Sequence, residues 1–258
     1  MIHPSAIISD QSSIDPSVFI GPYVVIEGSV SIGRGCRIQS HAVLRGPMTV
    51  GQNNHIHSHA VLGGSPQDLK YQEEDTTLSI GNNNTIREFV TINRGTIQGQ
   101  GQTRLGDHNL IMAYSHIAHD CRIGNHCILA NGSTLAGHVW LEDNVTIGGL
   151  SAVHQRVRIG RLAMVAGGSM VSQDIPPFML AQGDRASIRS LNFVGLRRFG
   201  LTPEDLRLLK KIFRIFQSHT AQKNRLSALQ PHVNQPVAQE ILSHLASTTR
   251  GICSFNTV

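Results

Sequence analysis

A branched aliphatic residue recurs at every sixth position through most of the chain, and this period constrains the fold more than any other feature. Six residues at 100° each do not return a side chain to the same side of an α-helix, so the repeat excludes a helical array. A short strand plus a tight turn can keep the period, and three such units close an eighteen-residue triangular coil. We therefore expect an all-β solenoid, a parallel β-helix of hexapeptide repeats whose coils stack at about 4.8 Å. The aliphatic positions are 2, 8, 14, 20, 26, 32, 38, 44, 50, 56, 62, 80, 86, 92, 105, 111, 117, 123, 129, 135, 141, 147, 153, 159, 165 and 171.

Two insertions interrupt the repeat. The first, near residues 63–79, contains the polar run SPQDLKYQEEDTT, and the second, near residues 93–104, is the Gly/Gln-rich segment NRGTIQGQGQTR. Loops that project from a rigid solenoid commonly carry binding groups. Both loops are therefore expected to contribute to a site.

The repeat ends at Pro176–Pro177, which predicts a β-helix over residues 1–176 and a linker with a small C-terminal α-helical domain over residues 177–258. Thr202 and Pro203, followed by two acidic residues, are typical of a helix start. A second helix is expected to begin near Pro236.

Charge is distributed unevenly between these two parts. Residues 1–176 carry 11 Lys/Arg and 13 Asp/Glu, whereas residues 177–258 carry 11 and 4. The basic C-terminal part predicts an acidic partner or a phosphorylated substrate. It does not predict nucleic-acid binding, because no aromatic interleaving or nucleic-acid module accompanies it. No apolar run is long enough to predict membrane insertion, and no signal peptide is evident.

Three of the four cysteines occupy the small interior position of the repeat. Cys36, Cys121 and Cys127 are interpreted as buried stacking residues in a reducing cytoplasm rather than as metal ligands. Cys253 is expected to be peripheral. The cysteine pattern therefore favours a cytoplasmic protein.

The eighteen-residue coil predicts which distant residues become neighbours. His119 should lie beneath Gly137, and Gly137 beneath Gln155. Such a histidine can accept a proton while the backbone N–H of the glycine faces a developing oxyanion. His116, His138 and His154 fall on the same three coils, which favours a functional site over scattered surface histidines.

Several motifs are similar to those of one known family, the UDP-N-acetylglucosamine O-acyltransferases (LpxA): QDLKY, NRGT, HIAHDC, NGSTLAGHV, AVHQ, QDIPP and AQG. The resemblance extends over the whole chain. It implies a left-handed β-helix, a cytoplasmic homotrimer with shared sites, and transfer of a 3-hydroxyacyl chain from acyl carrier protein to the 3-hydroxyl of UDP-N-acetylglucosamine, the first step of lipid A biosynthesis. It implies no metal and no cofactor, because the donor is carried on the phosphopantetheine of acyl carrier protein.

The resemblance also assigns roles to individual residues. His119 is implied as the general base, Asp120 as its support and Gly137 as the oxyanion-hole amide. Gly167 is implied as the residue that sets acyl-chain length, near fourteen carbons. The implied substrate-binding residues are Asp68, Lys70, His116, His138, His154, Gln155, Asn192 and Arg198. Three residues depart from the family pattern and leave the nucleotide contacts open: Arg185, Val194 and Phe199.

Alternatives remain at this stage. The closest rival is an N-acyltransferase that acts on a 3-amino UDP-sugar, and the sequence alone discriminates the two acceptors poorly. His55, His57 and His59 suggest a metal enzyme like γ-class carbonic anhydrase, although a solvated polar face is favoured. Gly167 belongs to a column at positions 113, 131, 149 and 167, three of which are Ala or Gly, and this column is expected beside the catalytic stack. It could instead be a turn glycine that needs a positive φ.

Overall fold

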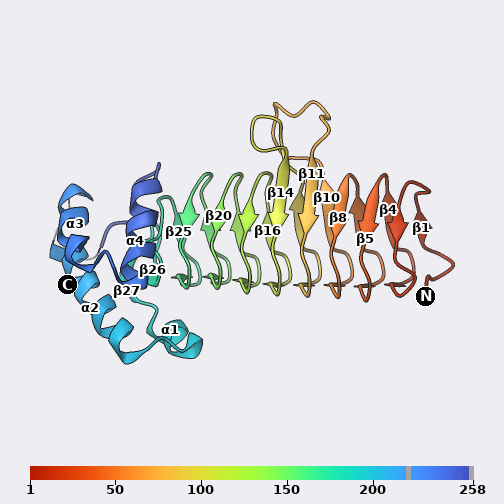
Figure 1. Ribbon diagram of the computed structural model, residues 1–258. Coiled ribbons are helices and arrows are strands. Elements are labelled where there is room, and N and C mark those ends of the chain that lie inside the picture. The colour runs from red at the N-terminus through yellow and green to blue at the C-terminus, as the bar shows by residue number, and fades with distance from the viewer. Residues whose placement is uncertain (219–221, 256–258) are drawn as a thin grey trace.

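The computed structural model describes residues 1–218 and 222–255 and shows a long stack of coils with helices at the C-terminal end (Figure 1). Each coil contributes one short strand to each of three sheets, which form the sides of a triangular prism. Strands eighteen residues apart pair in parallel, as Ile117 with Leu135 does. The predicted parallel β-helix is therefore confirmed.

The strands of the described residues fall into three sheets, which we number in chain order. Sheet 1 contains β1 (Ile7–Ile8), β4 (Val25–Glu27), β7 (Val43–Arg45), β10 (Val61–Gly64), β13 (Thr91–Asn93), β16 (His116–Ile117), β19 (Thr134–Leu135), β22 (Ala152–Val153) and β25 (Met170–Val171). Sheet 2 contains β2 (Ser13–Ile14), β5 (Val30–Ile32), β8 (Met48–Val50), β11 (Thr77–Ile80), β14 (Gln102–Leu105), β17 (Arg122–Ile123), β20 (Trp140–Leu141) and β23 (Arg158–Ile159). Sheet 3 contains β3 (Phe19–Ile20), β6 (Arg37–Ile38), β9 (His55–Ile56), β12 (Thr85–Ile86), β15 (Leu110–Ile111), β18 (Ile128–Leu129), β21 (Thr146–Ile147), β24 (Met164–Val165), β26 (Met179–Gln182) and β27 (Ser187–Leu191).

The repeated aliphatic residues form the core of the prism. From Ile20 to Val171 each of them is buried, whereas Ile2, Ile8 and Ile14 stay partly exposed in the first coil. That coil has a neighbour on one side only, so its interior is not closed. Full burial of one such side chain contributes about 1.5–3 kcal/mol, and the stack repeats this contribution coil after coil.

The cysteines lie in this interior as expected, with one exception to the prediction. Cys36, Cys121 and Cys127 are fully buried. Cys253 is also buried, so its expected peripheral position is wrong: its backbone N–H donates to the carbonyl of Asp174, and Ile252 forms a parallel bridge with Asp174.

The coils turn at three corners, which we name by the sheets they join: corner 1–2, corner 2–3 and corner 3–1. Both inserted loops lie at corner 1–2. Residues 65–76 connect β10 to β11, residues 94–101 connect β13 to β14, and Figure 1 shows both loops projecting from the same edge. Arg94 joins them, since its Nε donates to the Tyr71 hydroxyl at 3.1 Å. The two insertions therefore form one structure beside the coils.

The C-terminal residues fold into an antiparallel hairpin of β26 and β27, followed by helices. The helices are α1 (Phe193–Phe199), α2 (Pro203–Ser218), α3 (Gln222–Leu229), the 3-10 helix η1 (Gln230–His232) and α4 (Pro236–Ser247). The predicted starts at Pro203 and Pro236 are confirmed, and Thr202 caps α2 by accepting from the Asp205 N–H at 3.1 Å. Among the described residues no helix is long and apolar enough to cross a membrane.

Candidate active site

A cleft of about 570 Å³ lies at corner 1–2, under the first inserted loop. One wall of the cleft is formed by the coils, which contribute His119, Gly137 and Gln155, the residues predicted to stack. Residues 67–70 of the loop form its roof. The lining residues are Gln67, Asp68, Leu69, Lys70, His116, Ala118, His119, Ala136, Gly137 and Gln155. The structure thus brings six predicted site residues into one cavity: Asp68, Lys70, His116, His119, Gly137 and Gln155.

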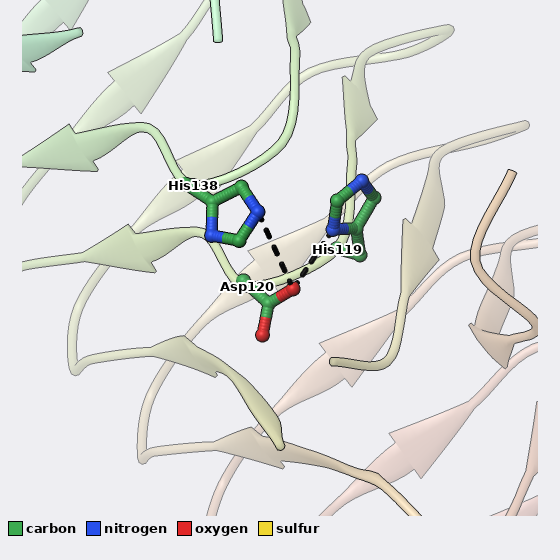
Figure 2. A group of neighbouring side chains, drawn as sticks. All are labelled: His119, Asp120 and His138. Atoms are coloured by element: carbon green, nitrogen blue, oxygen red, sulfur yellow. Dashed lines mark hydrogen bonds and ion pairs between the residues drawn. The ribbon is translucent and has the colours of Figure 1, made fainter. Parts of the chain in front are cut away.

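His119 and Asp120 form a buried pair at the base of this cleft. Nδ1 of His119 lies 2.8 Å from Oδ2 of Asp120, and Figure 2 shows the two side chains facing each other. Both side chains are nearly inaccessible to solvent, at 10% for His119 and 1% for Asp120. Because the pair is shielded from water, the hydrogen bond can fix the orientation of the imidazole ring.

The Asp120 carboxylate is held by the second inserted loop. It accepts hydrogen bonds from the Thr96 hydroxyl at 2.7 Å and from the Gln100 N–H at 3.0 Å. Burial opposes ionisation, but the hydrogen bonds from His119, Thr96 and Gln100 outweigh it and lower the pKa of Asp120 to about 2. The carboxylate is therefore ionised at neutral pH and can only accept hydrogen bonds.

This charge state determines the histidine tautomer. Because Asp120 cannot donate, Nδ1 of His119 must carry the hydrogen of the 2.8 Å contact. Nε2 then keeps a free lone pair, as a general base requires. A Cβ built on Gly137 would lie 2.6 Å from that Nε2, so glycine is needed to leave room for the ring.

The backbone N–H of Gly137 is available for a ligand. Among the described residues it has no hydrogen-bond acceptor, whereas the next N–H, of His138, donates to the His119 carbonyl at 3.0 Å. An unpaired N–H beside an imidazole nitrogen is the combination that stabilises an oxyanion next to a general base.

The other two histidines of these coils differ in their positions. His116 lines the cleft and pairs through Nδ1 with the Thr91 hydroxyl at 2.7 Å. His138 does not line the cleft, and its Nε2 lies 3.9 Å from Oδ2 of Asp120 (Figure 2). Burial lowers the pKa of both rings, which favours their neutral forms.

Comparison with known proteins agrees with this geometry. The family described as "Udp N-acetylglucosamine O-acyltransferase; Domain 2" matches residues 174–253, and bacterial hexapeptide transferase repeats match residues 11–46 and 102–137. The acyl-[acyl-carrier-protein]--UDP-N-acetylglucosamine O-acyltransferases of Herminiimonas arsenicoxydans and Janthinobacterium sp. (strain Marseille) are 48% and 51% identical to the chain. The first match covers 98% of both sequences, and the second covers 95% of this chain and 94% of the relative. The chain belongs to the UDP-N-acetylglucosamine O-acyltransferase family.

A solved structure of this family extends the agreement to the fold. LpxA of Acinetobacter baumannii superimposes with a TM-score of 0.95 at 39% identity, and the match covers 98% of this chain and 99% of that one. The fold is thus the left-handed parallel β-helix with a small C-terminal helical part, as the sequence predicts.

The remaining residues implied by the family resemblance lie outside the cleft. His154 lines a neighbouring apolar groove of about 320 Å³ on the outer face of sheet 1, which shares Ala136 with the cleft. Asn192 is buried and caps α1, because its Oδ1 accepts from the Gly195 N–H at 3.1 Å and its amide nitrogen donates to the Leu162 carbonyl. Arg198 lies exposed on α1.

Two of the three residues that depart from the family pattern, Phe199 and Arg185, have defined neighbours in the structure. The Phe199 ring packs under the Arg161 guanidinium, 5.1 Å from its centroid, and Arg185 lines the apolar groove beside Asp184. Val194 is exposed on α1, and nothing in the structure explains its departure from the family's acidic residue.

Gly167 lies apart from the catalytic pair. It follows β24 at corner 3–1, whereas His119 follows β16 at corner 1–2, so the width of sheet 1 separates the two columns. The expectation that they are adjacent is wrong, because one six-residue step crosses a whole side of the prism. The turn-glycine interpretation is also wrong, since the positive φ of this turn, +68°, belongs to Gly168.

The cleft contains contacts that the sequence did not predict. Gln67 lines it beside Asp68, and Thr96, Gln100 and Thr103 hold Asp120. The motif NRGT shows Thr96, but only a folded loop shows that this residue returns to a carboxylate 24 positions away.

The histidine run near residue 55 does not form a ligand set. His55 pairs with Gln39 and His57 with Glu88, while His59 stacks between the rings of His41 and Phe89. In the described part of the chain, the one group of three metal-binding side chains with converging donor atoms is His119, Asp120 and His138.

Proposed function

We propose that this protein transfers a 3-hydroxyacyl chain from acyl carrier protein to the 3-hydroxyl of UDP-N-acetylglucosamine, the first step of lipid A biosynthesis. The observation that carries the proposal is the His119–Asp120 pair beside the unpaired N–H of Gly137, inside a cleft roofed by Lys70. Relatives that are 48–51% identical over nearly the whole chain are named as O-acyltransferases that use acyl-[acyl-carrier-protein] and UDP-N-acetylglucosamine.

The chemistry follows from the tautomer of His119. Nε2 removes the proton of the sugar 3-hydroxyl, and the oxygen attacks the thioester carbonyl to form a C–O bond. The Gly137 N–H stabilises the oxyanion, and Asp120 stabilises the imidazolium. The C–S bond then breaks, and the phosphopantetheine thiol leaves with the proton returned from His119. The step needs no metal or further cofactor, because the thioester is already activated.

The roles of the surrounding residues belong to the same proposal. Lys70 offers positive charge to the diphosphate, while Asp68 and His116 contact the sugar nucleotide from the cleft lining. His138 contacts it from just outside that lining. Gln155 lies above Gly137, where it meets the donor. The groove floored by Ala136 and Ala152 leads from the cleft along sheet 1 and suits the acyl chain, since Val153, Met170 and Val171 also line it.

The acidic partner and the compartment complete this part of the proposal. Acyl carrier protein fits the excess of seven positive charges over residues 177–258. A cytoplasmic location rests on the buried free cysteines and on the resemblance, and cell fractionation tests it.

The active protein is proposed to be a homotrimer with shared sites. Exposed apolar residues gather at corner 3–1, where the rings of Tyr23, His41, His59, Phe89 and Tyr114 stack at 4.9–5.1 Å. Large exposed apolar patches mark interaction surfaces. If three copies meet at this corner, sheet 1 of one copy faces sheet 3 of the next. Gly167 and Arg198 of one copy then approach the groove and cleft of another.

The function is tested by mass spectrometry of products. The protein is incubated with a panel of acyl carrier protein thioesters and with both the 3-hydroxy and the 3-amino UDP-sugar. An ester of UDP-N-acetylglucosamine is the expected product. Exclusive reaction with the amino-sugar would make the protein an N-acyltransferase, and no product from either acceptor would overturn the proposal.

Shared sites are tested by complementation. His119→Ala and Arg198→Ala chains are co-expressed with different tags, and mixed trimers are isolated. If the two residues serve one site from different copies, each mixed trimer has one intact site and regains activity. Mixed trimers as inactive as either parent would contradict the arrangement, as would an active monomer in light scattering.

A further inference from the structure

Three donor atoms converge beside the catalytic cleft. Nδ1 of His119 lies 2.8 Å and Nε2 of His138 lies 3.9 Å from the same oxygen, Oδ2 of Asp120, and all three donors lie within 4.8 Å of one another. Zinc binds nitrogen and carboxylate oxygen at about 2.0–2.2 Å in tetrahedral sites. Neighbouring ligand atoms then lie roughly 3.3 Å apart, so shifts of about 1 Å or less would complete the geometry.

We propose that His119, Asp120 and His138 form a Zn²⁺ site that inhibits the enzyme. The metal takes the place of the hydrogen between Nδ1 of His119 and the carboxylate. That hydrogen moves to Nε2, so the ring stays neutral and no redox step occurs. Three protein ligands leave a fourth position for water, as in open zinc sites.

The inhibition follows from this exchange of positions. Nε2 of His119 is the atom that removes the proton of the sugar hydroxyl, and with the metal on Nδ1 it carries a hydrogen. A protonated Nε2 cannot act as a base. The metal therefore blocks catalysis by occupying Nδ1, while the hydrogen sits on Nε2, the nitrogen that is nearer to Gly137. This step rests on the proposed function, whereas metal binding itself does not.

Zinc should bind to His119, Asp120 and His138 in preference to the cysteine thiols of the described part of the chain. Among the described residues the His138 ring makes no hydrogen bond, and its Nε2 lies 3.9 Å from Oδ2 of Asp120, so this nitrogen can coordinate a metal. The ionised Asp120 supplies a negative charge. The thiols compete poorly, because burial raises the pKa of Cys121, Cys127 and Cys253 to about 12.

Metal binding is measured on the full-length, metal-free protein. ZnCl₂ is titrated by calorimetry, and CoCl₂ is followed by visible absorption, which reports tetrahedral coordination. One ion per chain is expected. His138→Gln removes a ligand and should weaken binding by more than tenfold, because even loss of an outer-shell partner costs about 10- to 100-fold. His126→Gln is the matched control, because His126 stacks on His108 at another corner.

The outcomes are separable. Equal zinc affinity of the wild type and His138→Gln overturns the site, and so does the absence of any binding heat. If His138→Gln unfolds, His119→Gln serves as the second variant, with circular dichroism as the check on folding. Zinc should inhibit acyl transfer reversibly, and zinc bound without inhibition overturns the inhibitory role. A protein that binds zinc through His138 but transfers no acyl chain refutes the proposed function and leaves the metal site intact.

Discussion

The backbone of Gly99 lies so close to the Asp120 carboxylate that a Cβ built at Gly99 would be 2.6 Å from Oδ2. The second inserted loop therefore reaches its position over Asp120 only with glycine at this place. The contact couples a loop at corner 1–2 to the hydrogen bond that orients His119. The length and composition of the loop thus contribute to the chemistry of the site.

Substitution at this contact should impair catalysis more than stability. Gly99→Ala is expected to displace the loop or the carboxylate and to lower kcat/KM roughly ten- to a hundredfold, as small misplacements of catalytic groups do. Gly101→Ala is the control, because its added Cβ meets nothing within 4 Å although its φ is +68°. An alanine at this positive φ should lower the free energy of unfolding by about 1–2 kcal/mol and leave kcat/KM nearly unchanged. Equal kinetic losses in both variants would contradict this interpretation.

Removal of the base tests the catalytic assignment. His119→Ala should lower kcat/KM with UDP-N-acetylglucosamine and acyl carrier protein by about 10² to 10⁴, because general-base catalysis contributes that much. The melting temperature should stay near that of the wild type, since the ring lines the cleft and Thr96 and Gln100 still donate to Asp120. A loss of less than tenfold would refute the role of His119 as base. His126→Ala, at an exposed stacked ring, serves as the control.

The pH dependence of stability reports on Asp120. Its folded pKa of about 2 lies below the ordinary value of 3.8, so its ionised form stabilises the folded state. This contribution is fully present above about pH 4 and is lost as the pH falls toward 2. The difference in unfolding free energy between the wild type and Asp120→Asn should therefore narrow between pH 4 and pH 2. Denaturant titrations across this range measure it, and a constant difference would show that the carboxylate charge contributes nothing.

Chelation separates a zinc-dependent enzyme from one that zinc only inhibits. Exhaustive treatment with EDTA should leave acyl transfer undiminished, because the proposed mechanism uses no metal. Activity that disappears with EDTA and returns with zinc would favour a metal enzyme instead.

Acyl-chain selectivity tests Gly167. Its backbone needs no positive φ, and a Cβ built there would lie 3.3 Å from the Gly149 carbonyl oxygen, so a larger residue should fold with a small adjustment. Gly167→Met should reduce transfer of long chains near fourteen carbons while sparing shorter ones, because a blocking side chain penalises only chains that reach it. Rates for each donor length are compared by mass spectrometry. A proportional loss for all donors would point to a general defect and end the assignment.

The sequence predicts the prism and the stacking of His119 under Gly137 because both follow from one period. Each aliphatic position is fixed by the need to bury it, and the eighteen-residue coil converts sequence separation into contact. Helix α2 can also be predicted from the sequence, since Thr202 is a typical N-cap and apolar residues recur at helical spacing along one face.

What the sequence could not predict lies where the period is broken. The return of Thr96 and Gln100 to Asp120 depends on the path of an irregular loop, for which no repeat exists. Helix α1 is only seven residues long and lacks an apolar period, so the sequence does not predict that Asn192 caps a helix. The period also does not show that Gly167 and His119 lie at different corners, because the sequence spacing alone does not reveal that one six-residue step crosses a whole side of the prism.

The site is built from residues of neighbouring coils and one pair of loops, while the coils before β7 contribute nothing to its lining. Because every coil repeats the same translation, removing residues 21–38, one complete turn, would shorten the prism without altering the spacing of His119, Gly137 and Gln155. Deleting a single residue between 121 and 136 would instead shift Gly137 by one position and place a side chain over the imidazole. The catalytic geometry should therefore survive the gain or loss of a complete eighteen-residue coil elsewhere in the prism. It should not survive an insertion or deletion of a few residues between His119 and Gln155.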